Sequence, residues 1–327
     1  MTRTIRWGIL GTGAIAHKFA TGLHNLPDIE LLAVGSRSQA SADVFADEFK
    51  IERRHSSYEA LAQDPDVDAI YISTPHPFHK ENTLLCLANG KAVLCEKPFA
   101  INAKEALEMI SFAREKKVFL MEAMWSRYLP HMVKVRELIA NDTIGEVRML
   151  EADFGFRTDV NPESRLFDPE LGGGALLDVG IYPVSLAFML FGAPVEVKSF
   201  ARLGSTGVDE EAAMLFSHRE GQLSLLSTAI RLTTPMEATI TGTKGYIRIA
   251  SPWWGPSNFT LHVGGKKPKK VKVATFNNGY NYEALEVSQC LREGKLESEI
   301  MPLDETLAIM KTLDTIRAQW GLKYPME

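Results

Sequence analysis

The sequence has few cysteines and no recognisable metal-ligand spacing. Its 327 residues include three cysteines, which are far apart and form no C-x-x-C pair: Cys86, Cys95 and Cys290. This usage argues against a disulfide framework or a cysteine zinc site, and it is typical of a reducing compartment such as the cytoplasm. No cluster of His, Cys and Asp residues has metal-ligand spacing either, so we expect chemistry that uses no metal ion.

An excess of basic residues is also absent. The 36 Lys and Arg residues are outnumbered by 41 Asp and Glu residues, so the formal net charge is −5. A chain with this balance is a poor candidate for binding nucleic acid or an anionic membrane surface. The one run of like charge, residues 266–270, lies between two expected strands and is interpreted as a solvated hairpin tip.

Long apolar runs are missing too. The first residues lead directly into an expected strand, without the apolar segment and small-residue cleavage site of a signal peptide. The most apolar stretch, residues 179–195, contains Pro183 and is shorter than a membrane-spanning helix. We therefore expect a cytoplasmic protein with no membrane partner, in which this stretch is a buried helix.

Apolar residues make up 45% of the chain, which is enough for two domains with ordinary cores. Residues 1–124 alternate strands and helices over short links, which predicts an α/β domain with a parallel sheet. Residues 125–327 are mostly strands joined by hairpin-type turns, which predicts a mostly antiparallel sheet, with a helix at residues 175–190. The strands expected in the first domain are residues 5–10, 29–34, 69–72, 92–95 and 118–121.

A glycine-rich loop follows the first expected strand and leads into a helix. Its G-x-G-x-x-A motif consists of Gly11, Thr12, Gly13, Ala14, Ile15 and Ala16. The first glycine allows a tight turn, the second lets a pyrophosphate approach the backbone, and the alanine permits close packing of helix and strand. The helix N-terminus offers free N–H groups to the phosphates. The motif predicts a dinucleotide-binding domain; a purely structural glycine turn is the alternative.

The end of the second expected strand indicates which dinucleotide is bound. Enzymes that use NAD usually place a carboxylate there for the ribose 2′-hydroxyl. This chain has Ser36, Arg37 and Ser38 instead, and an arginine between two hydroxyls suits a 2′-phosphate. We therefore expect NADP rather than NAD; the alternative is that Arg37 is a solvated surface residue and either cofactor is used.

Two further segments carry candidate chemistry. Glu96, Lys97 and Pro98 follow the fourth expected strand, at the carboxyl edge of the sheet, where ligands bind. Asp178 and Tyr182 are four residues apart in the expected helix that follows three glycines, so they share one helix face. They are interpreted as a proton donor with its orienting partner; a polar pair that only packs is the alternative.

Taken together, these motifs resemble the Gfo/Idh/MocA oxidoreductase family over essentially the whole chain. The resemblance rests on the glycine loop, on Glu96-Lys97-Pro98 and on the segment from Gly172 to Tyr182. Within the family it is greatest for the dihydrodiol dehydrogenases and the NADP-dependent D-xylose dehydrogenases, because Tyr182 stands where many sugar and inositol members have His. Pieces such as His76-Pro77-x-His79 and Met121–Trp125 point to the same group.

The resemblance implies a fold and a set of catalytic residues. It implies an N-terminal Rossmann domain and a C-terminal α/β domain with a large, open, mostly antiparallel sheet, one face of which builds a homodimer or a dimer of dimers. It also implies a cis peptide between Lys97 and Pro98. Lys97, Asp178 and Tyr182 carry over as catalytic, with Lys97 next to Tyr182 as the cation that the phenol needs to ionise.

The expected binding residues fall into two sets. The cofactor is expected to contact the glycine loop, the residues after the second strand, and residues after the later strands: Thr74, Pro75, His76, His79, Glu96, Lys97 and Trp125. His79 has a structural alternative, in which it only caps the following helix. The substrate is expected to contact Trp125, Phe154, Arg157, Asp178, Tyr182, Trp254, Phe276 and Tyr280.

These expectations describe an NADP-dependent oxidoreductase. It would move a hydride between nicotinamide and a hydroxyl-bearing carbon of a sugar or cyclic polyol, with Tyr182 exchanging the hydroxyl proton. Oxidation of trans-dihydrodiols and reduction of dicarbonyl sugars are alternatives with the same chemistry. A protein that senses NADP and has lost turnover is an alternative of another kind, and the joint presence of Lys97, Asp178 and Tyr182 argues against it.

Overall fold

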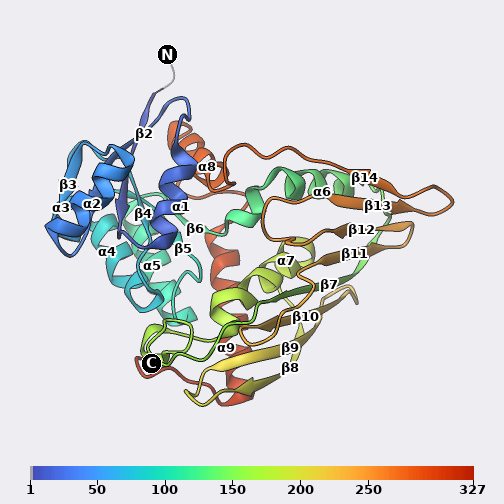
Figure 1. The fold of residues 1–327 in the computed structure, drawn as a ribbon. Helices are drawn as coiled ribbons and strands as arrows, with labels where there is room; N and C mark the ends of the chain where they lie inside the picture. Colours follow the sequence, from blue (N-terminus) through green and yellow to red (C-terminus); the bar gives the residue numbers. More distant parts are fainter. Residues whose placement is uncertain (1–2) are drawn as a thin grey trace. The chain divides into compact units, whose positions relative to one another are not determined.

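The computed structural model describes residues 3–327, and they form two compact units (Figure 1). Unit 1 contains the chain up to Trp125 together with Phe276–Leu307, and unit 2 contains Ser126–Thr275 and Ala308–Glu327. Residues 276–307, which the sequence analysis includes in the second domain, therefore pack with the first unit. The last helix, α9 (Leu303–Trp320), contributes to both units.

Unit 1 is built around a six-stranded parallel sheet. The strand order is β3-β2-β1-β4-β5-β6, and every neighbouring pair is parallel, which confirms the expected Rossmann architecture. The strands are β1 (Ile5–Leu10), β2 (Ile29–Gly35), β3 (Arg53–His55), β4 (Ala69–Ile72), β5 (Ala92–Glu96) and β6 (Leu120–Ala123). The order reverses between β1 and β4, and the carboxyl ends at such a reversal are where α/β sheets bind ligands.

The helices of unit 1 link these strands. They are α1 (Ala14–Leu23), α2 (Gln39–Phe49), α3 (Tyr58–Ala62), the 3₁₀ turn η1 (His76–Phe78), α4 (His79–Ala88), α5 (Ala103–Lys116) and the returning α8 (Asn281–Arg292). The strands β4 and β5 are buried along their whole length, as expected for strands with both faces covered. Strand β3 was not expected, because its Arg-Arg-His sequence is polar and only three residues long.

Unit 2 contains an eight-stranded sheet in the order β14-β13-β12-β11-β7-β10-β9-β8. All pairs are antiparallel except β7 with β10, so the expectation of a large, mostly antiparallel sheet is confirmed. The strands are β7 (Val147–Gly155), β8 (Glu196–Leu203), β9 (Asp209–Ser217), β10 (Leu223–Ala229), β11 (Ala238–Gly242), β12 (Gly245–Ile249), β13 (Phe259–Val263) and β14 (Lys269–Val271).

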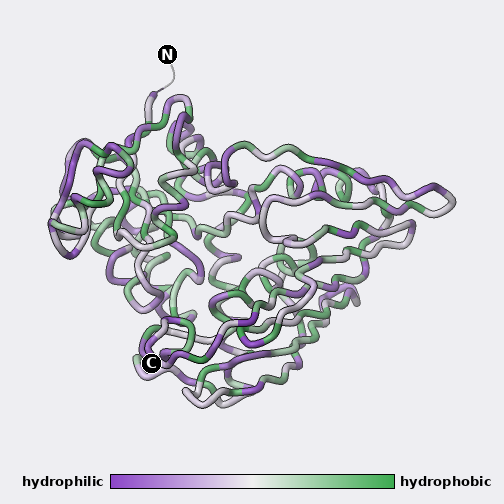
Figure 2. The backbone as a smooth tube through the Cα atoms, in the orientation of Figure 1, coloured by the Kyte–Doolittle hydropathy of each residue, from purple (hydrophilic) through white to green (hydrophobic). Residues whose placement is uncertain are grey.

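Helices and alternating side chains divide this sheet into a covered and an open face. The helical elements are η2 (Trp125–Tyr128), α6 (Pro130–Ala140), η3 (Pro169–Leu171), the π-helical turn η4 (Leu176–Gly180) and α7 (Ile181–Phe191), of which α7 contacts β7 and β10. Buried and exposed residues alternate over the second half of β9 and the first half of β10. Hydropathy does not follow this alternation, because leucines also occupy exposed positions; Figure 2 colours the chain by hydropathy. Phe200, Leu215 and Leu225 remain exposed.

One helical segment of the described residues, Pro169–Phe191, is long and apolar enough to cross a membrane by length and composition. Of its most apolar window, 83% is buried within the protein. Burial of this kind is typical of a core helix, which passes the same test of length and composition.

Candidate functional site

The glycine loop has the geometry that a dinucleotide phosphate needs. Gly11 has a φ of +105°, and a Cβ there would lie 2.8 Å from the Ser73 hydroxyl oxygen. A Cβ on Gly13 would meet no atom within 4 Å, so open space lies in front of the N-terminus of α1. Gly13 is the N-cap of α1 and supplies no side-chain cap, which leaves the first N–H groups of the helix for an anion. These residues therefore fit a pyrophosphate.

The three residues after β2, Ser36, Arg37 and Ser38, differ in their burial and contacts. Ser38 caps α2, because its hydroxyl oxygen accepts the backbone N–H of Ser41 at 3.3 Å. Ser36 is buried, whereas the side chain of Arg37 is exposed. Burial raises the pKa of the nearby Tyr58 phenol, and the charge of Arg37 opposes that rise. Arg37 is thus a cation at the strand end that normally carries a carboxylate in NAD enzymes.

The loop after β4 is tied to the segment after β5 by a buried histidine. His79 has one ring nitrogen 2.8 Å from the Thr74 carbonyl oxygen and the other 2.9 Å from the Pro98 carbonyl oxygen. Burial is the largest cause that lowers the pKa of this imidazole, so the neutral form donates to one of the two carbonyls. His79 is fully buried at the start of α4, and both carbonyls lie outside that helix, so these bonds link the two loops. Thr74 and His76 are also buried there, and each retains a little exposed surface.

Lys97 follows a buried group of polar side chains. The Lys97–Pro98 peptide is cis, as the resemblance implied. Glu96 accepts a hydrogen bond from the Tyr71 hydroxyl and, at 3.2 Å, from the backbone N–H of Lys97. Burial, together with the charge of Glu96, raises the pKa of the fully buried Glu283 well above its usual range.

Glu283 was not expected from the sequence. It lies on α8, about 190 residues after Glu96, and a Glu in an amphipathic helix gives no sign of burial on its own. Only the return of residues 276–307 to unit 1 brings the two carboxyl groups into one cluster.

The expected aromatic residues are divided between the two units. In unit 1, Trp125 and Tyr280 stack with ring centroids 4.2 Å apart and an interplanar angle of 11°. Phe276, also in unit 1, is 54% exposed, and its backbone N–H donates to the Tyr282 hydroxyl at 2.8 Å. The other expected aromatics, Phe154, Tyr182 and Trp254, all belong to unit 2.

In unit 2 these three rings make an aromatic cluster, in which Phe154 and Tyr182 are each 6% exposed. Phe154 from β7 stacks on Trp254 with centroids 4.3 Å apart and an angle of 8°. Tyr182, at the start of α7, tilts against both rings, with centroids 5.3 Å from Phe154 and 5.9 Å from Trp254. A stacked pair with a phenol at its edge can accept the face of a ring-shaped molecule.

The helix that carries Asp178 differs from the expectation. A single α-helix was expected over residues 175–190, but Leu176–Gly180 form a π-helical turn and the α-helix begins at Ile181. The Ile181 N–H donates to the Leu176 carbonyl, five residues back. Pro183 has no N–H to donate to the carbonyl of residue 179, which removes the ordinary α-helical bond at this point. Turns of this type often occur at functional sites.

An arginine that the sequence analysis did not select contacts Asp178. Arg165 Nη1 lies 2.6 Å from Asp178 Oδ1, in a charge-assisted hydrogen bond. The arginine that the sequence analysis did select, Arg157, is exposed and forms an isolated β-bridge with Arg231. Nothing in the pattern of the intervening loop distinguishes Arg165 from a surface charge.

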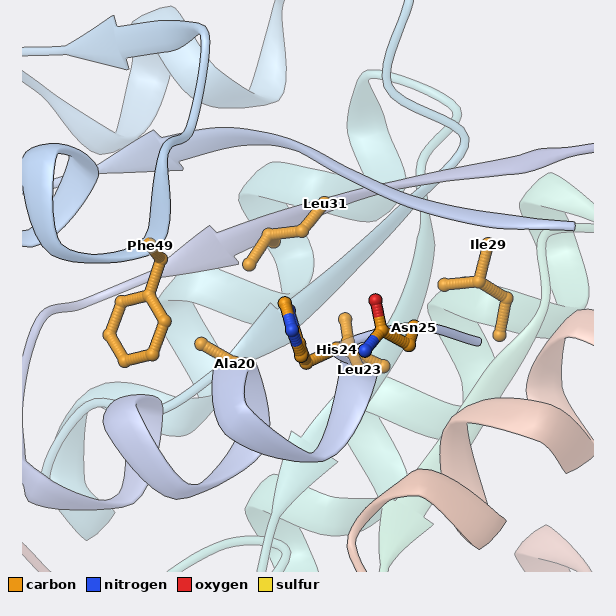
Figure 3. A pocket seen from close by; sticks show the side chains of 7 residues that line it. All are labelled: Ala20, Leu23, His24, Asn25, Ile29, Leu31 and Phe49. Carbon is orange, nitrogen blue, oxygen red and sulfur yellow. The ribbon is translucent and has the colours of Figure 1, made fainter. Parts of the chain in front are cut away.

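A shallow hollow elsewhere in unit 1 contains none of the expected site residues. It has a volume of about 200 Å³ and lies at the C-terminal end of α1, whereas the glycine loop lies at the N-terminal end of that helix (Figure 3). Its lining consists of Ala20, Leu23, His24, Asn25, Ile29, Leu31 and Phe49. Across residues 3–327, no group of three or more His, Cys, Asp or Glu residues could hold a metal ion.

Comparison with solved structures shows the same fold in oxidoreductases. An aldose–aldose oxidoreductase from Caulobacter crescentus, complexed with glycerol, has a TM-score of 0.89 and 23% identity over 98% of both chains. A 3-ketoreductase from Actinomadura kijaniata, in complex with NADP, has a TM-score of 0.86 and 24% identity over 97% of this chain and 98% of its own.

Sequence identity to curated proteins is higher than identity to these solved structures. Proteins named trans-1,2-dihydrobenzene-1,2-diol dehydrogenase are 41% identical in Mus musculus and 37% identical in Homo sapiens, each over 99% of both chains. Residues 5–124 match the family model "Oxidoreductase family, NAD-binding Rossmann fold", and residues 132–248 match the "GFO/IDH/MocA C-terminal domain". The chain is therefore an NAD(P)-dependent oxidoreductase that belongs to the Gfo/Idh/MocA family.

Proposed function

We propose that this enzyme uses NADP to oxidise a hydroxyl-bearing ring carbon, or to reduce the corresponding carbonyl. The observation that supports this most is the stacked pair of Phe154 and Trp254 with the tilted Tyr182 ring beside it, which would offer an aromatic surface to a substrate. A sugar or a cyclic polyol has an apolar face that suits such a surface, and a hydroxyl at its rim that suits the phenol.

A trans-dihydrodiol is the second candidate substrate. The curated relatives are named for such a diol, and its flat hydrocarbon ring would also stack on Phe154 and Trp254. Both candidates carry vicinal hydroxyls on a ring, so the choice depends on the panel experiment below.

The proposed cofactor residues belong to unit 1. The backbone of Gly11–Ile15 would hold the pyrophosphate, and Ser36 with Arg37 would hold the 2′-phosphate, while Thr74 and His76 would border the dinucleotide. When bound, NADP supplies or accepts the hydride. The first 124 residues would thus form the cofactor domain, and residues after Trp125 would supply the substrate surface.

The proposed catalytic residues are Tyr182, Lys97 and Asp178. Tyr182 would exchange the proton of the substrate hydroxyl. Lys97 would support the same step through its positive charge, and Asp178, held by Arg165, would orient the substrate. These roles follow the family resemblance together with the burial and partners of each residue.

We also propose a cytoplasmic homodimer or dimer of dimers, assembled through the open face of the sheet in unit 2. The exposed Phe200, Leu215 and Leu225 make that face apolar, and exposed apolar patches mark interaction surfaces.

The experiment is a substrate panel. Reduction of NADP⁺ is followed by absorbance with aldoses, inositols and trans-diols, and NAD⁺ serves as the second cofactor. Turnover with one class and not the others identifies the substrate group. Tight binding of NADP without turnover on any member would refute the enzymatic proposal and favour the NADP-sensing alternative.

A further inference from the structure

The glycine turn, residues 172–174, leads to Asp178. Buried polar side chains from later parts of the chain in unit 2 lie around this turn. These are Asp209 at the start of β9, Arg317 near the end of α9, and Tyr324 in the last turn of the chain. Their exposed fractions are 0%, 3% and 1%. Charged and polar side chains of this size are rarely so buried unless they have specific partners.

Asp209 holds the start of the π-helical turn. Its Oδ2 accepts the backbone N–H of Leu176 at 2.7 Å, which satisfies one of the N–H groups that a helix start leaves without an internal partner. Its Oδ1 would lie only 2.2 Å from a Cβ at position 174, where the backbone also has a φ of +114°. Glycine at position 174 is therefore required by both the backbone angle and the carboxylate.

Tyr324 holds the same turn through a second backbone group. Its hydroxyl donates to the Gly173 carbonyl oxygen at 2.6 Å, across 151 residues of sequence. A Cβ at position 173 would lie within 2.9 Å of three backbone carbonyl oxygens, those of residues 165, 166 and 168. The turn is thus both close-packed and hydrogen-bonded at Gly173.

The last turn of the chain is itself fixed by Arg317. The guanidinium lies over the Tyr324 ring, 4.9 Å from its centroid, and forms two hydrogen bonds with the Glu327 carboxylate, at 2.7 and 3.0 Å. Glu327 in turn accepts the backbone N–H of Tyr324 at 2.9 Å. These bonds orient the Tyr324 hydroxyl toward Gly173, because they fix both its ring and its backbone.

We propose that Asp209 and Tyr324 are positioning residues for Asp178 and Tyr182. By holding the Gly173 carbonyl and the Leu176 N–H, they set the direction in which the π-helical turn leaves the glycine turn, and so the placement of the two side chains that follow. The inference rests on the proposed catalytic role of Asp178 and Tyr182, and it concerns contacts within unit 2 alone.

The test uses Tyr324→Phe, which removes one hydroxyl and keeps the ring under Arg317. Amide hydrogen exchange of residues 174–182 should accelerate by about 5- to 10-fold, the effect of one lost hydrogen bond. The kcat should fall by about 10-fold, since small displacements of catalytic groups are costly. The dissociation constant for NADP should not change. Met326→Ala is the matched control, because Met326 lies in the same turn and is 38% exposed.

A second pair of variants tests Asp209 independently. Asp209→Ala should accelerate the same exchange and lower kcat, and Asp209→Asn should recover most of the loss, because its amide oxygen still accepts the Leu176 N–H. Unchanged exchange in Tyr324→Phe and Asp209→Ala, or faster exchange with normal kcat, would overturn the proposal. Normal turnover in Tyr182→Phe would instead overturn the catalytic assignment, a result that the exchange measurement does not affect.

Discussion

Arg37 is the residue on which the expected choice between the two dinucleotides depends. It is exposed after β2, in a segment without a carboxylate. Replacing it with alanine should weaken binding of NADP by roughly 1.5–3 kcal/mol, the usual contribution of a hydrogen bond to a charged group, and leave NAD binding nearly unchanged. Fluorescence titration with both dinucleotides measures the difference.

A nearby arginine provides the control for this prediction. Arg54 lies on the neighbouring strand β3 and forms ion pairs with Asp43 and Asp47. Arg54→Ala should leave the preference between NADP and NAD unchanged. Tighter binding of NAD than of NADP by the unmodified enzyme would contradict the prediction.

Tyr182 is the residue that tests the proposed proton exchange. Tyr182→Phe removes one oxygen and keeps the ring against Phe154 and Trp254, so fold and NADP affinity should persist. Turnover should fall by roughly 10²–10⁴, the usual size of a general acid–base contribution. Steady-state kinetics on the identified substrate provides the measurement.

Lys97→Met belongs to the same test. It should lower turnover comparably, and the double variant should lose less than the product of the two losses, because groups that act in one step are not additive. Near-normal turnover in Tyr182→Phe would assign the proton to another group and leave Tyr182 a structural part of the aromatic surface.

At the scale of elements, the start of β9 makes stability depend on pH. Burial raises the pKa of Asp209 from 3.8 to about 7, and the neighbouring Arg317 opposes part of the rise. The folded protein therefore retains this proton up to about pH 7, whereas the unfolded chain loses it near pH 4. Stability from this group is present at low pH and declines as the pH rises from about 4 through 7.

Asp209→Asn should remove this contribution, because an amide does not titrate. Between pH 5 and pH 8 the unmodified protein should lose about 2–3 kcal/mol more unfolding free energy than the variant, at 1.36 kcal/mol for each pKa unit. Urea unfolding of both proteins at the two pH values gives the comparison. Parallel pH profiles would contradict the raised pKa.

Elements with a strong local pattern were predicted correctly, and weak ones were not. Strands β1, β4 and β5 matched the expected ranges within a residue, since each is a short apolar run between turn signals. Strand β3 was missed because it is polar, and β14 includes Lys269 and Lys270, which were expected to belong to a hairpin tip. Strands at a sheet edge bury little, so hydrophobicity does not reveal them.

At the scale of the whole molecule, the open sheet face of unit 2 should determine assembly. Phe200 is 82% exposed on the edge strand β8, opposite Ala213 of β9 and two residues along from the exposed Leu215. Phe200→Glu should shift the protein from dimer toward monomer, because it places a charge in an apolar interface. Light scattering at micromolar concentration measures the mass.

Val44→Glu is the matched control. Val44 is 71% exposed on α2 of unit 1, outside the sheet, so its replacement should leave the mass unchanged. A monomer mass for the unmodified protein at micromolar concentration would contradict the proposed dimer.

The sequence by itself determined the local features of this protein and the family to which it belongs. The strand–loop–helix around Gly11 and Gly13, the alternation of strands and helices before Trp125, and the Glu96-Lys97-Pro98 segment are contiguous, so their meaning can be read from neighbouring residues. The fold class and the family expected from them are confirmed. The roles of the individual site residues remain predictions.

Only the tertiary structure decided which distant side chains support the candidate site. Arg165 on Asp178, Glu283 with Glu96, and Tyr324 on Gly173 join residues that are 13, roughly 190 and 151 positions apart. A charged or phenolic side chain carries no sequence signal of burial, because burial depends on which elements pack around it. The return of residues 276–307 to unit 1 and the closure of the last turn on the glycine turn supply that packing, and neither follows from local pattern.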